Sequence, residues 1–148
     1  MIINVLDYLD HSVSNVPEKV VFADINNQII YRDLQSHGRK IGTAIGKELK
    51  DLRQPIVVFV ERNIECLVAF MGVAYSGNFY VPIDIQMPIA RIQLILETLK
   101  PVGIVNTPDS RGFAAKVAPD LLEFDYQDII ADTIIDENGL NAIRRQIV

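Results

Sequence analysis

The stretch "SGNFYVPIDIQMPIARIQLILE", from Ser76 to Glu97, decides the fold. It contains a short apolar run that is interrupted by Pro82 and followed by Asp84. Pro88 comes next, and proline suits the first turn of a helix because its missing N–H is not needed there. We therefore expect a strand over 79–83, a corner at Asp84, and a helix that begins at Pro88. Such a corner serves either as scaffold or as part of a binding site, and the residues favour scaffold.

Strand and helix patterns alternate along most of the chain. The β-branched run "PIVVFV" at 55–60 is typical of a strand buried on both faces, as in a parallel sheet. Strands are expected at 19–25, 28–31, 55–60, 79–83, 102–107 and 121–124, with helices at 2–13, 32–50, 64–75, 88–99 and 108–119 and short helices in the tail. Asn26 and Asn27 suit a tight turn, since asparagine tolerates positive φ. The alternation predicts a single α/β domain with a largely parallel sheet flanked by helices on both faces.

Size, charge and hydropathy exclude several classes of function. The chain has 148 residues and a net charge of −5, which argues against nucleic acid or an anionic membrane as a partner. The longest apolar run, 67–75, is much shorter than the roughly 20 residues that a membrane-spanning helix needs. The N-terminus lacks the basic and apolar regions of a secretory signal. Cys66 is the single cysteine, so no intrachain disulfide forms. We expect a soluble, cytoplasmic protein.

A phosphate-binding loop is absent from the sequence. Such a loop needs several glycines between a strand and a helix, where bare backbone amides approach an anion. The one cluster of glycines, Gly38, Gly42 and Gly46, has a spacing of four inside an expected helix. A glycine inside a helix costs about 1 kcal/mol relative to alanine and needs a packing reason. We therefore interpret the cluster as a small-residue stripe that packs closely on a neighbouring element.

Metal-binding and nucleophilic patterns are weak as well. His11 and His37 are far apart, and neither has a further ligand at helical spacing. Asp7 and His11 are four residues apart and could pair, although a solvated helix face explains them better. Cys66 lies among apolar residues, which predicts a buried, inert thiol.

Three charged residues follow the strand at 55–60. Glu61, Arg62 and Glu65 lie where ligands gather in α/β folds, at the carboxyl ends of strands. A solvated loop between strand and helix is the simpler interpretation. The residues alone thus indicate an α/β domain without a recognisable catalytic set.

The stretch from Ser76 to Glu97 resembles the second core motif of the adenylate-forming enzymes. These include the adenylation domains of nonribosomal peptide synthetases, D-alanine–carrier-protein ligases and acyl-CoA synthetases. The matching residues are Gly77, Tyr80, Val81, Pro82, Ile83 and Asp84, then Pro88, Arg91, Ile92 and Leu96. Upstream, "IIYRDL", with Tyr31 and Leu34, is similar to the family's first landmark, and residues 57–77 are similar to the segment between the two. The resemblance implies the N-terminal subdomain of the adenylate-forming enzyme fold, spread over nearly all of residues 1–148.

The departures from the family pattern are of two kinds. Asn78 and Ile30 replace the residues usual at their positions, and these changes are mild. More importantly, the family's phosphate loop with its lysine, its acyl-adenylate motifs and its catalytic lysine all come after the point where this sequence stops. The resemblance therefore implies an incomplete N-terminal fragment with no catalytic, cofactor-binding or metal residue of its own.

The matching residues are then expected to have structural roles. They are Tyr31, Leu34, Gly77, Tyr80, Pro82, Asp84, Pro88 and Arg91. Pro82 should limit strand pairing because it lacks an amide donor. Asp84 should fix the turn, either by accepting hydrogen bonds from nearby backbone amides or by pairing with Arg91.

The resemblance also implies a reaction for the parent enzyme. A carboxylate attacks ATP, with Mg²⁺, to give an acyl-adenylate, and the acyl group passes to a thiol on a phosphopantetheine carrier protein or on coenzyme A. The "YVPID" form favours amino-acid-activating members. The fragment itself is expected to be inactive, and its partner is the C-terminal remainder of the AMP-binding domain.

Two alternatives remain open at this stage. One is a truncated, stand-alone interaction module without catalysis, which would form homo-oligomers through exposed apolar surface. The other is an unrelated flavodoxin-like or nucleotide-binding domain, which would carry a bound flavin or nucleotide.

Overall fold

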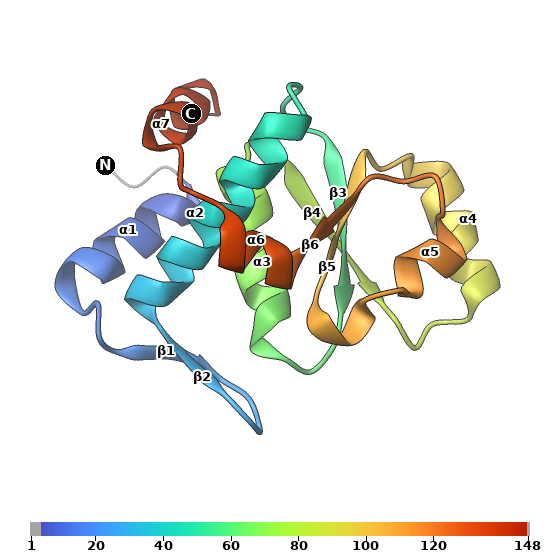
Figure 1. Ribbon diagram of the computed structural model, residues 1–148, viewed down its shortest axis with the longest axis horizontal. Helices are drawn as coiled ribbons and strands as arrows, with labels where there is room; N and C mark the ends of the chain where they lie inside the picture. Colours follow the sequence, from blue (N-terminus) through green and yellow to red (C-terminus); the bar gives the residue numbers. More distant parts are fainter. Residues whose placement is uncertain (1–3, 148) are drawn as a thin grey trace.

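A four-stranded parallel sheet forms the centre of the molecule, in a computed structural model that describes residues 4–147. The strands lie in the order β4-β3-β5-β6 (Figure 1). Their bounds are β3 (Pro55–Val60), β4 (Phe79–Asp84), β5 (Gly103–Asn106) and β6 (Glu123–Asp125). A separate antiparallel hairpin consists of β1 (Val20–Ala23) and β2 (Gln28–Ile30). The side chains from Ile56 to Phe59 are fully buried, as the β-branched run predicts for a central strand.

Helices cover both faces of this sheet. One face carries α1 (Val5–Asn15), α2 (Tyr31–Glu48), α3 (Ile64–Tyr75), α6 (Tyr126–Asp132) and α7 (Glu137–Gln146). The other face carries α4 (Ile89–Leu99) and α5 (Phe113–Val117). The first core contains Ile56, Val58 and Val105, and the second contains Val57, Phe59 and Ile104, so alternate residues of the strands serve opposite faces. The predicted fold class is confirmed.

The connections give the sheet its order. The chain steps from β3 through α3 to β4 on one side of β3, then crosses through α4 to β5 on the other side, and continues through α5 to β6. Helices that accompany steps in opposite directions lie on opposite faces, which is what right-handed crossovers require. This is the start of a doubly wound sheet, whose direction of winding reverses between β3 and β5.

Two predicted elements differ in their bounds for local reasons. The expected helix at 108–119 is divided into a 3₁₀ turn, η1 (Pro108–Ser110), and α5. Gly112 separates them with φ of +87°, a conformation that does not continue a helix. Tyr31 begins α2 and does not end a strand, so β2 is shorter than expected.

The N-terminal helix and the hairpin turn also require corrections. The expected helix at 2–13 is α1, from Val5 to Asn15, and the expected start at residue 2 lies outside the described residues. Leu6 and Leu9 are buried, whereas Val5 is 51% exposed. Asn26 and Asn27 do not adopt positive φ, which only Arg53 and Lys100 do among the non-glycine residues of 4–147. The Asp24 carboxylate holds the turn instead.

The stripe of glycines on α2 packs against α3, as predicted. A Cβ atom at Gly42 would lie 2.6 Å from the Tyr75 Cβ, and one at Gly72 of α3 would lie 2.4 Å from the Ile41 Cβ. Such distances are shorter than van der Waals contact, so the two helices approach each other as only glycine permits. Gly46, at the end of the stripe, has more room, since its nearest neighbour would be Ile143 at 3.5 Å.

These distances separate two substitutions on one helix. Gly42→Ala should lower the free energy of unfolding by about 1–3 kcal/mol, because the added methyl group forces α2 and α3 apart. Gly46→Ala should be neutral or should stabilise by up to about 1 kcal/mol, because alanine favours the helix and the methyl group fits. Urea denaturation of both variants measures the difference. Equal effects would show that the stripe reflects composition and not close packing.

Candidate functional site

The carboxyl ends of β3 and β5 form the place where a doubly wound sheet binds ligands. The chain leaves these neighbouring strands in opposite directions and so opens a crevice between the two connections. Glu61 and Asn63 follow β3, while Thr107 and Ser110 follow β5. Of these, Thr107 and Ser110 are almost fully buried.

Hydrogen bonds join the two connections directly. The Thr107 hydroxyl donates to Glu61 Oε2 over 3.1 Å, and Asn63 Nδ2 donates to Asp109 Oδ2 over 2.9 Å. The Thr107 N–H donates to the Ser110 hydroxyl over 3.0 Å. The polar side chains in the crevice are therefore occupied with one another.

The environment of Glu61 disfavours its charged form. Burial raises the pKa of the Glu61 carboxyl above its ordinary value, and the hydrogen bond from Thr107 opposes this. Negative charges on Asp109 and Glu65 raise the pKa further. Glu61 is thus partly buried, and no ion pair within residues 4–147 joins it to a cation. These features fit a structural role better than that of a side chain in a solvated loop.

A carboxylate of the protein already lies at the N-terminus of α3. Asp24, in the β1–β2 turn, accepts from the Ile64 N–H over 3.1 Å and from the amides of Asn26 and Asn27 over 2.8 Å and 2.7 Å. These backbone donors lower the pKa of Asp24, with Asn27 the largest contributor. Asn63 caps the same helix by accepting from the Cys66 N–H over 3.1 Å. An external anion would have to displace the Asp24 carboxylate.

Two of the backbone amides that could bind an anion at the start of α3 already have acceptors. The Ile64 N–H donates to Asp24 and the Cys66 N–H donates to Asn63. Within 4–147, no group of three or more histidine, cysteine, aspartate or glutamate side chains could hold a metal ion.

Cys66 is buried beside this crevice. Its thiol donates to the Phe59 carbonyl over 3.3 Å and accepts from the Glu61 N–H over 3.2 Å. Burial raises the pKa of the thiol, so the reactive thiolate is disfavoured. The predicted buried thiol is confirmed in position.

The corner after β4 shows which of the two expected roles Asp84 has. Its carboxylate accepts from the Gln86 N–H over 2.9 Å, and its carbonyl accepts from the Met87 N–H over 3.0 Å. No ion pair joins Asp84 to Arg91 in the part of the chain that the structure describes. Asp84 fixes the turn through backbone amides, and Pro88 then precedes the first residue of α4.

The backbone nitrogen of Pro82 faces the outer edge of β4, away from β3. The Phe79 N–H donates to the Gln54 carbonyl over 3.1 Å, so Phe79, Val81 and Ile83 direct their backbone groups toward β3. Because backbone groups alternate along a strand, the nitrogen of Pro82 faces outward. The proline leaves the pairing with β3 intact and removes a donor only from the outer edge.

The remaining motif residues support helix packing. Leu34 is 2% exposed in the core beneath α2, and Tyr31 packs against the same core. Gly77 ends α3 with φ of +79°. The Tyr80 ring stacks on Phe70 of α3 with 4.4 Å between centroids. The motif residues thus lie at the start of α2 and along the segment from the end of α3 through β4 to α4, with Gly77 and Asp84 at opposite ends of β4.

A half-buried ion-pair cluster on α1 was missed by the sequence analysis. Arg144 of α7 pairs with Asp7 and Asp10, and the Tyr75 hydroxyl donates to Asp10 over 3.2 Å. His11 is exposed, as a solvated helix face implies, whereas Asp7 and Asp10 have a cationic partner that this interpretation did not include. Asp10 and Arg144 are 134 residues apart in the sequence, so no local pattern could have paired them.

The geometry defines residues 4–147 as a doubly wound α/β sheet with helices on both faces. Comparison with known proteins identifies its family, because residues 9–144 match the family described as AMP-binding enzyme. The chain belongs to this family. It is 28% identical over 106 residues to the D-alanine–D-alanyl carrier protein ligase of Staphylococcus epidermidis, which covers 72% of this chain and 21% of that protein.

Solved structures agree on the fold. The nonribosomal peptide synthetase FmoA3, in a form bound to α-methyl-L-serine-AMP, has a TM-score of 0.77 at 17% identity and covers 85% of this chain and 14% of FmoA3. A putative long-chain-fatty-acid CoA ligase from Rhodopseudomonas palustris has a TM-score of 0.77 at 16% identity, over 90% of this chain and 38% of that one. In residues 4–147, no helix has the length and apolar character needed to cross a bilayer.

The raised pKa of Glu61 predicts a pH dependence of stability. A carboxyl whose pKa is higher in the folded protein contributes stability below its unfolded pKa and loses it as the pH rises through the folded value. Glu61→Gln removes this loss and keeps an acceptor for Thr107. The stability of Glu61→Gln relative to wild type should therefore increase between about pH 4 and pH 7. Urea denaturation across this range measures it, and a constant difference would contradict the assignment.

Proposed function

We propose that this chain is the N-terminal scaffold of an ATP-dependent ligase that activates an amino acid or another carboxylic acid. The enzyme forms an acyl-adenylate and transfers the acyl group to a thiol on a carrier protein or on coenzyme A. The observation that carries the proposal is the match of residues 9–144 to the AMP-binding enzyme family. The D-alanine–D-alanyl carrier protein ligases among the relatives support an amino acid and a carrier protein over a fatty acid and coenzyme A.

The geometry supports a scaffold role for this portion. The crevice at the carboxyl ends of β3 and β5 is filled by Glu61, Thr107 and Asp24, and the motif residues fix turns and helix packing. The chain spans 21% of the Staphylococcus epidermidis relative, so the groups that bind ATP and Mg²⁺ are proposed to belong to the remainder of such an enzyme. What these residues contribute is a rigid sheet edge and a fixed corner at Asp84.

The purified chain should not catalyse ATP–pyrophosphate exchange with D-alanine or with any member of a panel of amino and fatty acids. The reason is that the sequence contains no phosphate-binding loop and that the Ile64 and Cys66 amides at the start of α3 already have acceptors. Exchange is measured with labelled pyrophosphate, with the Staphylococcus epidermidis ligase as positive control. Exchange above background that depends on one acid would contradict the scaffold role.

The reading frame after the codon for Val148 supplies a second test. If the frame continues into a Ser/Thr/Gly-rich loop with a lysine, the longer product should exchange pyrophosphate where the short one does not. A stop codon directly after Val148 in the native gene would remove the ligase proposal for this product.

The second candidate, a non-catalytic module that self-associates, rests on exposed apolar side chains. Phe79 on β4 and Ile89 and Leu94 on α4 are 48%, 49% and 63% exposed. Such side chains favour association when they form a continuous patch.

Self-association predicts a molar mass that rises with concentration in light scattering. Leu94→Lys should then reduce the mass, because the charge disfavours burial of this face. Gln93→Lys, an exposed position on another side of the same helix, is the control. A constant monomer mass for the wild-type chain would eliminate this candidate.

A further inference from the structure

We propose that the outer edge of β6 and the groove beside it are a docking surface for a basic, extended segment of another polypeptide, which adds to the sheet as a further strand. The groove has a volume of about 600 Å³. Its sides are formed by β6, by α2 and by α6 with the residues that follow it. Ala44, Phe124, Ile129 and Ile134 supply its apolar surface.

The backbone of β6 offers free positions on this side. The Ile104 N–H donates to the Leu122 carbonyl over 2.9 Å, so Leu122 and Phe124 direct their backbone groups toward β5. Glu123 and Asp125 lie between them in the alternation and direct their N–H groups outward. An added strand would pair with these groups, as in other cases of strand addition at a sheet edge.

The two edges of the sheet differ in a way that favours β6. On β4, Pro82 removes an outward donor in the middle of the strand. On β6, the sequence from Glu123 to Asp125 contains no proline. The short length of β6 limits how many backbone hydrogen bonds an added strand can form. Its acidic side chains oppose pairing with an acidic strand, but they do not oppose pairing with a basic one.

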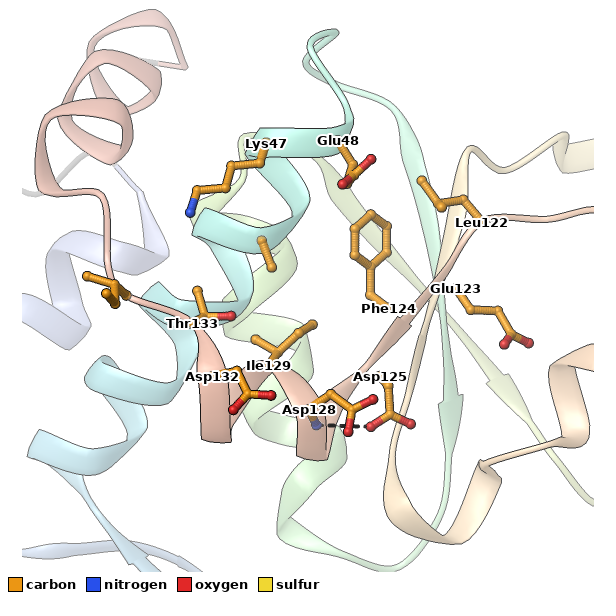
Figure 2. A pocket seen from close by; sticks show the side chains of 12 residues that line it. Lys47, Glu48, Leu122, Glu123, Phe124, Asp125, Asp128, Ile129, Asp132 and Thr133 are labelled. Carbon is orange, nitrogen blue, oxygen red and sulfur yellow. Dashed lines mark hydrogen bonds between the residues drawn. The ribbon is translucent and has the colours of Figure 1, made fainter.

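The charges around the groove select the partner. Figure 2 shows Lys47 and Glu48 at one end of the groove and Asp125, Asp128 and Asp132 at the other, with Phe124 between them. Glu123 adds a further carboxylate, and Lys47 is the single basic residue among the groove's described lining. Arg111 pairs with Asp125 over 2.9 Å and with Asp128 over 3.5 Å, which leaves an excess of negative charge. Electrostatic complementarity therefore requires lysine or arginine on the partner.

The same charges disfavour a second copy of this chain. Two β6 edges that met across a two-fold axis would place both carboxylate groups opposite each other. Like charges directly opposite in a sheet are destabilising. A homodimer through this edge is therefore not the occupant that we propose.

The right-handedness of crossover connections would direct a strand that followed α7 toward β4 and away from β6. Both α6 and α7 pack on the face that carries α3. The step from β3 through α3 leads toward β4, so a right-handed crossover through α6 and α7 leads toward β4 as well. Ile147 lies near Gly77, just before β4, which agrees with that direction. A parallel strand that followed α7 would leave the edge of β6 open.

Side-chain alternation defines the sequence of the partner strand. Phe124 points to the α2 face, and the alternation along the strand directs Glu123 away from it. Asp125, at the end of the strand, accepts from the Asp128 N–H at the start of α6. A strand beside β6 would therefore place apolar residues over Ala44 and Ile129 and basic residues beside Glu123. An alternating pattern of valine and lysine satisfies both requirements.

The test uses a short, blocked peptide in which lysine and valine alternate, and a matched peptide of glutamate and valine. With the basic peptide, amide hydrogen exchange at Glu123 and Asp125 should slow by about tenfold or more, while exchange at Val57 should not change. The acidic peptide should have no effect. Basic peptide that does not bind, or that binds without slowing exchange at these two amides, would overturn the proposal.

Two variants of one residue separate backbone pairing from charge. Glu123→Pro removes an outward N–H that does not pair with β5, and it should weaken peptide binding by about tenfold. Glu123→Gln keeps the N–H and should weaken binding only about twofold to threefold. Equal binding by wild type and Glu123→Pro would overturn strand addition. Unchanged hydrogen exchange at Val57 verifies that the variants fold. The comparison of the basic and acidic peptides uses the wild-type chain and so does not depend on the variants.

Protein concentration provides the last arm. In the absence of peptide, exchange at Glu123 should be independent of concentration. If it slows as the concentration rises, a second copy occupies the edge and the proposed partner is wrong. The peptide-binding and hydrogen-exchange results are independent of ligase activity, since neither measurement involves ATP–pyrophosphate exchange.

Discussion

The close approach of α2 and α3 is the constraint on which the rest of the molecule depends. Gly42 and Gly72 have no Cβ, and each brings the backbone of its helix against the side chains of the other, at Tyr75 and Ile41. Because α3 also lies directly on β3, this contact fixes the position of α2 above the sheet. The hairpin of β1 and β2 precedes α2, and its Asp24 then reaches the start of α3.

This arrangement explains why the usual ligand position of a doubly wound sheet is closed. Helix N-termini attract anions because their first amides have no partner in the helix. Here a carboxylate from the hairpin satisfies an amide at the start of α3, and Thr107 joins Glu61 across the crevice. The protein uses a position that binds ligands in other folds to fasten its own hairpin. A scaffold needs this rigidity, whereas a nucleotide site at the same position would need the amides to be free.

The fold could be predicted from the sequence wherever local patterns carry the information. The buried run at 55–60 and the glycine stripe each predict a feature that the structure contains, because each depends on residues that are close in the chain. Features that depend on distant pairs could not be predicted in this way. Arg144 reaches Asp7 and Asp10 from the last helix, and nothing near Asp10 in the sequence indicates this cation. The motif residues were placed only through resemblance, and their roles as scaffold stay a prediction.

The two edges of the sheet show that the sequence assigns them different tasks. Proline in the middle of β4 costs the sheet nothing, because its nitrogen faces away from β3. A strand that approached β4 from the outer side would lack one backbone hydrogen bond, because Pro82 has no N–H to donate. At β6 the outward backbone donors remain, and charge selects the partner, since the carboxylates around the groove repel an acidic segment and attract a basic one. One edge is therefore restricted by backbone chemistry and the other by electrostatics, and only the second restriction can be lifted by a suitable partner.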